Sequence, residues 1–395
     1  MNEEWFKILN GDVFDMLKTI PDNSVDTVMT SPPYWQMRDY DHSGQLGHEE
    51  KVEDYINNMV KVGEELFRVL KETGLYFLNV DDKFVNGELQ LIPYRIAFEI
   101  SKKGWKTVMN IPWIKPNGIP RDARYRLRHV HEPIMVFAKN LTMKYWFNQY
   151  TKEITSVEPE SVYMNCPNDV HTNDKYCKFC KDTGQIQAWY KMPYYFDNNG
   201  VRTKWNSPGE IEATKKSELS YIDAFFDVEV KTEAETTHVK QYEKNSTAIY
   251  RNLTTKRSQL KEMYEVVRDD GLLFNPIGRT SFDYIKAITN ETDCVDAWEM
   301  TTKPDLKHQH EAAYPPWLCL IPVMLSCPPD GTVLDPFNGS ASTGVAALLL
   351  KRKYIGVELN PDYAKMSIER LSSVPIPSEI PEVLSETIWN KAGGL

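Results

Sequence analysis

Apolar and polar positions follow a repeating block pattern over the first 140 residues. Apolar runs that predict strands cover 6–10, 24–29, 75–81, 105–113 and 134–137. Between them lie segments with helical periodicity, of which 13–17, 52–70 and 91–100 are the clearest, and Gly74 is expected to end the second. Helices that alternate with apolar strands in this way are typical of a parallel sheet.

One predicted strand stops abruptly in the run Thr30-Ser31-Pro32-Pro33-Tyr34-Trp35. Neither proline can donate to a strand ladder and both fix φ, so the residues around them are held rigidly at the strand's carboxyl end, where ligands bind in open α/β sheets. The Pro32 carbonyl and the Ser31 hydroxyl are suited to accept the two hydrogens of a planar amino group, on whose ring Tyr34 could stack. A proline-terminated strand followed by core aromatics would explain the same residues.

A second block of the same kind lies near the C-terminus. An apolar strand at 333–335 runs into a Gly turn, a helical pattern follows around 346–350, and a second strand ends on Glu358. This unit has about the length of a nucleotide-binding half-fold. The sequence contains no G-x-x-x-x-G-K-[ST] run to cradle phosphates, so a nucleoside without phosphates fits better, with Glu358 accepting hydrogen bonds from ribose hydroxyls.

Together these stretches resemble the amino-methylating DNA methyltransferases that use S-adenosylmethionine (SAM), in the permuted class in which the catalytic motif precedes the SAM motif. Ser31-Pro32-Pro33-Tyr34 matches the catalytic motif, and Asp335-Pro336-Phe337-x-Gly339-Ser340 matches the SAM loop. The run from Gly356 to Tyr363 matches the ribose-binding strand and the helix after it. The resemblance covers roughly residues 5–140 and 295–372.

The resemblance implies a Rossmann-like SAM methyltransferase fold, α/β in class, with a mostly parallel seven-stranded sheet that has one antiparallel strand. It divides the chain into a catalytic half at 1–140, a target-recognition insert at 141–294, a SAM-binding half at 295–373 and a tail at 374–395. The insert is polar and shows no obvious sheet pattern.

The family's site residues carry over position by position. The resemblance implies catalytic roles for Ser31, Pro32, Pro33 and Tyr34, and SAM contacts for Asp12, Asp335, Pro336, Phe337, Gly339, Ser340, Glu358 and Asn360. For Asp12, a helix N-cap is a compatible alternative. Ala341 departs from the family, which usually has a second Gly there. Its Cβ is tolerated if the residue lies in the first helical turn, whereas a positive φ predicts weaker SAM binding.

The implied reaction is transfer of a methyl group from SAM to the exocyclic amino group of a base flipped out of double-stranded DNA. In the family, Ser at the first motif position goes most often with cytosine N4, and Asp or Asn with adenine N6. Ser31 therefore predicts cytosine N4, with adenine N6 as the alternative. A DNA-binding protein without chemistry and an RNA methyltransferase are the competing classes.

The charge of the chain bears on how it holds DNA. Its 395 residues carry a formal net charge of −10, so DNA binding would need a local basic patch. The clearest cluster of cations is Arg121, Arg124, Arg126 and Arg128, which could contact phosphates. A solvated arginine-rich loop is the alternative interpretation.

Inside the insert lies Cys166-x4-His171-x5-Cys177-x2-Cys180, which supplies four ligands of the type that tetrahedral Zn²⁺ uses. We expect a structural zinc ion there, although Asp169, Asp174 or a ligand from elsewhere in the chain could replace His171. Reduced cysteines in a loop are the alternative. No apolar run is long enough to span a membrane, and the N-terminus does not resemble a signal peptide, so a cytoplasmic protein is expected. A cognate restriction endonuclease and a homodimer are compatible with the resemblance.

Overall fold

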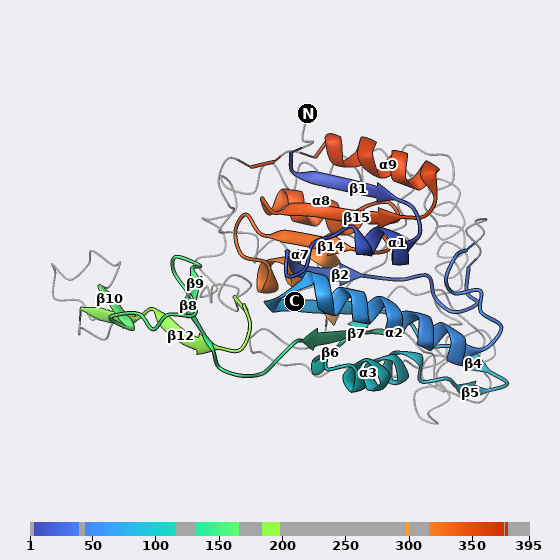
Figure 1. Cartoon of the computed structure of the whole chain (residues 1–395), viewed down its shortest axis with the longest axis horizontal. Coiled ribbons are helices and arrows are strands. Elements are labelled where there is room, and N and C mark those ends of the chain that lie inside the picture. The colour runs from blue at the N-terminus through green and yellow to red at the C-terminus, as the bar shows by residue number, and fades with distance from the viewer. Residues whose placement is uncertain are drawn as a thin grey trace, which may run out of the picture.

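A mixed eight-stranded sheet forms the centre of the computed structural model, which describes residues 4–38, 44–115, 131–165, 184–197, 298–299, 316–374 and 376–377 (Figure 1). In spatial order its strands are β1 (Phe6–Asn10), β15 (Lys353–Glu358), β14 (Thr332–Asp335), β2 (Val25–Thr30), β3 (Leu70–Asn79), β7 (His131–Ala138), β6 (Lys106–Ile114) and β13 (Trp298–Glu299). Only β7 runs against its neighbours, β3 and β6. The predicted fold is confirmed, and the two-residue β13 adds an edge to the seven expected strands.

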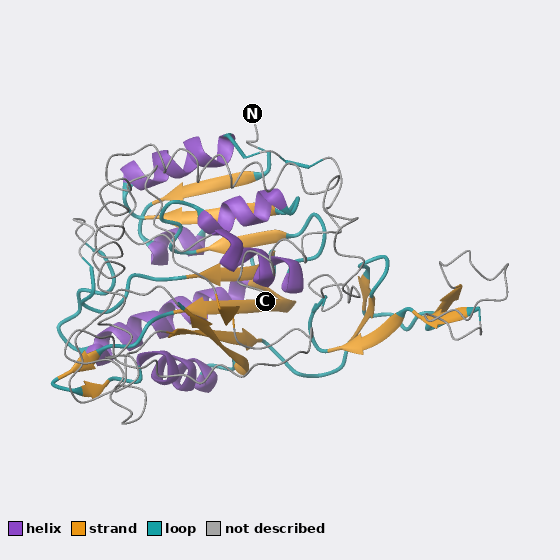
Figure 2. Cartoon of the chain, turned by 180° about the vertical axis from the view of Figure 1, so that it is seen from behind, coloured by secondary structure: helices purple, strands orange, loops and turns teal. Residues whose placement is uncertain are grey.

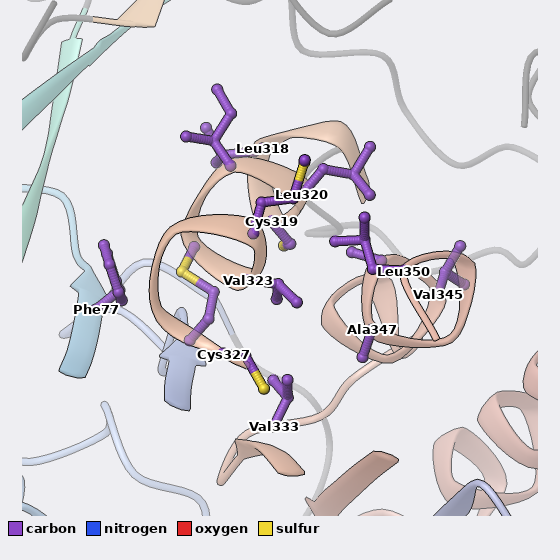
Figure 3. Close-up of a cluster of buried hydrophobic side chains, with 14 of the residues drawn as sticks. Phe77, Leu318, Cys319, Leu320, Val323, Cys327, Val333, Val345, Ala347 and Leu350 are labelled. Carbon is purple, nitrogen blue, oxygen red and sulfur yellow. The ribbon is translucent and has the colours of Figure 1, made fainter. Parts of the chain in front are cut away.

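Helices cover both faces of this sheet (Figures 1 and 2). They are α1 (Val13–Lys18), α2 (Val52–Val69), α3 (Ile92–Lys102), α7 (Pro316–Ser326), α8 (Ser342–Leu349) and α9 (Pro361–Ser372). Successive strand residues point to opposite faces. Phe77 therefore joins the cluster beneath α7 and α8 that Figure 3 shows, while Tyr76 and Leu78 join the cluster beneath α2 and α3.

The long helix ends earlier than the sequence pattern predicts. α2 ends at Val69 and β3 begins at Leu70, so Gly74 lies inside a strand and not at a helix terminus. A Cβ atom on Gly74 would lie 2.6 Å from the backbone oxygen of Asp26 on β2. The prediction for Gly74 was therefore wrong because the residue is needed for close strand approach, a use of glycine that resembles helix termination in sequence.

The first part of the insert contains strands that the sequence pattern missed. β8 (Tyr145–Asn148), β9 (Ile154–Thr155) and β12 (Trp189–Met192) form one antiparallel sheet, and β10 (Tyr163–Asn165) pairs with β11 (Gln185–Gln187). Figure 1 shows these elements as an arm that projects from the main sheet. Two backbone hydrogen bonds join its base to the body, from Tyr195 N to Thr73 O and from Asp197 N to Leu325 O. A further two-residue hairpin, β4 (Phe84–Val85) with β5 (Glu88–Leu89), follows β3.

Candidate active site

The two predicted motifs meet at one rim of the sheet. β2 and β14 are parallel neighbours, so their carboxyl ends lie side by side. The Thr30 hydroxyl, at the end of β2, donates to Asp335 Oδ1, at the end of β14, over 2.6 Å. The structure therefore places the predicted catalytic motif, which begins at Ser31, directly beside the loop that begins at Pro336.

Asp335 is a buried carboxylate held by donors from three parts of the chain. Besides Thr30, it accepts hydrogen bonds from the Thr343 hydroxyl at 2.9 Å and from the Phe337 backbone N–H at 3.0 Å. Only 1% of its surface is exposed. A buried charge needs such partners. These bonds give Asp335 a structural role at the rim.

Glu358 lies at the end of β15, the next strand along. Its two carboxylate oxygens accept from the backbone N–H groups of Gly339 at 2.7 Å and Asn360 at 2.9 Å. Burial raises the pKa of the Glu358 carboxyl above its ordinary value, while the backbone donors act in the opposite direction. Gly339 has φ 51°, a left-handed conformation that glycine adopts without the penalty of a Cβ. Glu358, Gly339 and Asn360, all predicted to bind the cofactor, are thus brought together.

Asn338 occupies the variable position of the predicted loop, and its structural role was missed by sequence reasoning. Its side-chain oxygen accepts from the buried Tyr354 hydroxyl at 2.8 Å. A Cβ atom on Gly356 would overlap that same oxygen. Gly356 is therefore required for the space that Asn338 fills.

Ala341 has a positive φ, the strained one of the two conformations that the sequence analysis left open. It is the residue before α8, with φ 63° and ψ 38°, and it is fully buried. This left-handed conformation is disfavoured for a residue with a Cβ. The preceding Ser340 is also buried, and its carbonyl accepts from the Arg370 guanidinium on α9 at 3.0 Å.

The catalytic motif is braced by hydrogen bonds from other elements. Ser31 Oγ donates to Tyr34 Oη at 3.1 Å, and Tyr34 Oη donates to Glu132 Oε2, on β7, at 2.9 Å. The Tyr55 hydroxyl on α2 donates to the Pro33 carbonyl at 2.9 Å. Pro32 is buried. Glu132 carries no motif signature, so only its place beside the motif in the fold reveals it.

The remaining predicted residues fall into two groups. Asp12 is the N-cap of α1 and accepts from the Phe14 N–H at 2.9 Å, which confirms the N-cap alternative. It follows Gly11, whose N–H donates to the Glu358 carbonyl at 2.9 Å, so it stands at the same rim. Arg121, Arg124, Arg126, Arg128, Cys166, His171, Cys177 and Cys180 lie outside the described residues.

Within the described ranges, no group of three or more His, Cys, Asp or Glu side chains could hold a metal ion. None of the helices in those ranges is long and apolar enough to cross a bilayer.

Comparison with known proteins identifies the family. The family model described as DNA methylase, that of the N6/N4 methyltransferases, matches residues 25–369. The chain belongs to the N6/N4 DNA methylase family. Members are DNA amino-methyltransferases, and SAM is the methyl donor.

One relative matches nearly the whole chain, and another matches about a third of it. Type II methyltransferase M.SfiI of Streptomyces fimbriatus is 25% identical over 422 aligned positions, covering 97% of this chain and 93% of that protein. Type II methyltransferase M.MwoI of Methanothermobacter wolfeii is 44% identical over 138 positions, which are 34% of this chain and 21% of the relative. Among solved structures, the PvuII cytosine-N4-specific DNA methyltransferase is similar with a TM-score of 0.45 at 15% identity, covering 99% of this chain and 94% of that one.

The side chains at the rim fit SAM. Glu358 offers a carboxylate at a strand end, the type of group that binds ribose hydroxyls, and the Gly339 backbone lies against it. Phe337, half-buried beside them, offers an aromatic surface. An N6/N4 DNA methylase would hold the nucleoside part of SAM with these residues.

Proposed function

We propose that this chain is a site-specific DNA methyltransferase that methylates cytosine at N4. The observation that carries the proposal is the 2.6 Å bond between Thr30 and Asp335, because it supports one shared site for the catalytic motif and the cofactor loop. Ser31 at the first motif position favours cytosine over adenine. The motif after β2 precedes the loop after β14 along the chain, which is the order of the permuted class, and we assign the chain to that class.

The chemistry required of Ser31, Pro32 and Tyr34 follows from the substrate. The lone pair of an exocyclic amino nitrogen is delocalised into its ring, and the base lies inside the duplex until it is flipped out. The Ser31 hydroxyl and the Pro32 carbonyl accept the two amino hydrogens and favour a tetrahedral nitrogen with an available lone pair. The Tyr34 ring stacks on the base. SAM supplies an electrophilic methyl group when bound.

Positioning accounts for much of the expected rate. Holding two partners in reactive orientation can lower a barrier by up to ~7–11 kcal/mol. The bonds that fix the motif to Asp335, Tyr55 and Glu132 are the means by which the fold supplies this rigidity.

The remaining predictions extend this proposal to DNA binding. We propose that residues 141–294 recognise the target sequence, that Arg121, Arg124, Arg126 and Arg128 contact phosphates, and that Cys166, His171, Cys177 and Cys180 hold a structural zinc ion. The type II names of the relatives support a role in restriction–modification, with a cognate endonuclease. DNA as substrate supports a cytoplasmic location.

The test is to identify the methylated nucleoside. The purified chain is incubated with methyl-labelled SAM and unmethylated bacterial DNA, or with RNA, and the nucleosides are separated after digestion. We expect label in N4-methyldeoxycytidine, and loss of label with Ser31→Ala although SAM binding is retained. Label in N6-methyldeoxyadenosine would assign adenine as the target. Label confined to RNA, or no label, would contradict the proposed function.

A further inference from the structure

A chain of hydrogen bonds leads away from the catalytic serine into the sheet. It runs from Ser31 Oγ to Tyr34 Oη over 3.1 Å and from Tyr34 Oη to Glu132 Oε2 over 2.9 Å. The other oxygen of Glu132 forms an ion pair with Lys115 Nζ. The Glu132 side chain is only 7% exposed, so these partners replace water around it. Ser31 is thus connected to a buried charged pair.

The direction of each bond follows from the chemistry of its atoms. An ionised carboxylate can only accept, so Tyr34 must donate its single proton to Glu132. A longer contact of 3.4 Å, to Asn79 Oδ1, is the weaker alternative for that proton. Since the Tyr34 proton is committed, the Tyr34 oxygen accepts from Ser31. The Ser31 proton therefore points into the protein, and the lone pairs of Ser31 Oγ are left to face a substrate.

Lys115 keeps the carboxylate of Glu132 in its acceptor state. An ammonium group beside a buried carboxylate stabilises the ionised form. Lys115 is itself held over the Trp113 ring, with Nζ 4.3 Å from the ring centre, and Trp113 pairs with Glu132 across β6 and β7. Asn79 Nδ2 adds a donor to Glu132 Oε2 at 3.3 Å. Tyr34, Asn79 and Lys115 thus all present donors to the Glu132 carboxylate.

We propose that Glu132 is a positioning residue that fixes Ser31 as a hydrogen-bond acceptor, and that it thereby makes the site select an amino group over a carbonyl at the target atom. This inference deepens the proposed function and rests on it. It holds for cytosine or adenine, because both present an amino group where uracil or hypoxanthine presents a carbonyl oxygen. A carbonyl would face the lone pairs of Ser31 with no proton between them.

The isosteric change Glu132→Gln allows the direction of these hydrogen bonds to reverse without changing the shape of the side chain. A glutamine amide can donate to the Tyr34 oxygen. The Tyr34 proton is then available to Ser31, and Ser31 can turn its own proton toward the substrate. The variant should therefore discriminate less strongly against a carbonyl, while the Pro32 carbonyl still favours an amino group.

The experiment compares two duplexes that differ only at the target base. One carries the base identified by the nucleoside assay, and the other carries the matching carbonyl base, uracil for cytosine or hypoxanthine for adenine. Dissociation constants are measured with S-adenosylhomocysteine present, so that no turnover occurs. The ratio of the two constants is compared between wild type and variant, which cancels any difference in the ease of flipping a mismatched base.

We expect Glu132→Gln to reduce this preference for the amino base about tenfold, the scale of one hydrogen bond to a charged group. Tyr34→Phe, which removes the connecting hydroxyl and keeps the ring, should reduce it by a similar factor. The double variant should lose no more of the preference than either single variant, because both changes interrupt the same series of hydrogen bonds. Tyr34→Phe alone decides the matter if Glu132→Gln fails to fold.

The matched control is Glu64→Gln. Glu64 also pairs with a lysine, Lys103, at 2.8 Å, but on the surface of α2 and α3. This change should leave the preference and S-adenosylhomocysteine binding unaltered. An unchanged preference in Glu132→Gln or Tyr34→Phe on a duplex that the wild type methylates would overturn the inference and leave the proposed function intact. Loss of S-adenosylhomocysteine binding in step with the preference would also overturn it, because that result indicates general structural damage.

Discussion

The Thr30 hydroxyl lies 2.6 Å from the Asp335 carboxylate, although 305 positions separate the two residues in the chain. Asp335 is buried, so its charge depends on protein donors. The bond therefore couples the end of β2, which carries the proposed catalytic motif, to the end of β14, which carries the proposed cofactor loop. Thr343 extends the same link, because its hydroxyl donates to Asp335 at 2.9 Å from within α8.

Replacing Thr30 by valine should weaken both the fold and the cofactor site. The change keeps the shape of the side chain and removes one donor from a buried carboxylate, which should lower the free energy of unfolding by about 2 kcal/mol. SAM affinity should fall as well, because the loop loses one of its anchors. Urea denaturation and calorimetric titration with SAM measure the two effects.

Thr27→Val is the matched control on the same strand. The Thr27 hydroxyl is also buried, but its partner at 2.9 Å is the neutral hydroxyl of Ser326. Its replacement should cost about 1 kcal/mol and leave SAM affinity unchanged. Equal effects of the two valines on SAM binding would contradict the role assigned to Thr30.

Ala341→Gly should stabilise the protein. Ala341 has φ 63°, and glycine adopts this conformation without the penalty of a Cβ, which is about 1 kcal/mol. SAM affinity should rise if the strain is carried by the cofactor loop. As a control, Ala347→Gly within α8 should destabilise the protein by about 1 kcal/mol, because glycine is a poor helix former. A lower melting temperature for Ala341→Gly would contradict the strain argument.

SAM binding should depend on pH through Glu358. Burial raises the pKa of this carboxyl above its ordinary 4.5, so it takes up a proton earlier than surface carboxyls as the pH falls. The protonated form loses an acceptor for ribose, and SAM affinity should decrease as the pH drops through the raised pKa. The stability of the protein without SAM depends on pH in the opposite direction. Because the pKa of Glu358 is higher in the folded state, this group stabilises the fold below pH 4.5, and the stabilisation is lost as the pH rises through the folded-state pKa.

The variant Glu358→Gln distinguishes the effect of Glu358 on the pH dependence of SAM binding from the effects of other titrating groups. The variant should bind SAM more weakly at neutral pH and show no change of affinity in the acid range where the wild type does. Titration calorimetry over a pH series provides the comparison. Parallel pH profiles for the two proteins would remove Glu358 from the ribose site.

Gly356→Ala should disturb the cofactor loop from beneath. The added methyl group would overlap the side-chain oxygen of Asn338, which is held by the Tyr354 hydroxyl and has little room to move. We expect a loss of stability of about 2 kcal/mol, typical of overpacking in a filled core, together with weaker SAM binding. Thermal unfolding and SAM titration of the variant measure both, and a variant with wild-type SAM affinity would show that the loop does not depend on Asn338.

Sequence patterns located seven of the eight strands of the main sheet and both motifs of the site because these are local signals. The prolines after Ser31 and the acid at Glu358 each mark a strand end without reference to the rest of the fold. The family resemblance implied a mostly parallel sheet with one antiparallel strand, and parallel strands joined by helices have few arrangements.

The residues that join the site could not be found in this way. Thr30 and Glu132 act through partners hundreds or tens of positions away, and Thr343 contacts Asp335 only because the intervening loop folds back. No local pattern assigns these three residues their partners. Gly74 was misread because close strand contact and helix termination both call for glycine. The strands of the arm were missed because two to four residues are too few to show alternation.

Photolabelling tests the central claim most directly, namely that the catalytic motif and the cofactor loop line a single site. A SAM analogue with a photoreactive group in place of the transferable methyl is bound to the full chain and irradiated, and the labelled peptides are mapped with excess SAM as competitor. The account predicts label at residues 31–34, with competition by SAM and weaker labelling in Glu358→Gln. Labelling that SAM displaces but that never reaches residues 31–34 would contradict it.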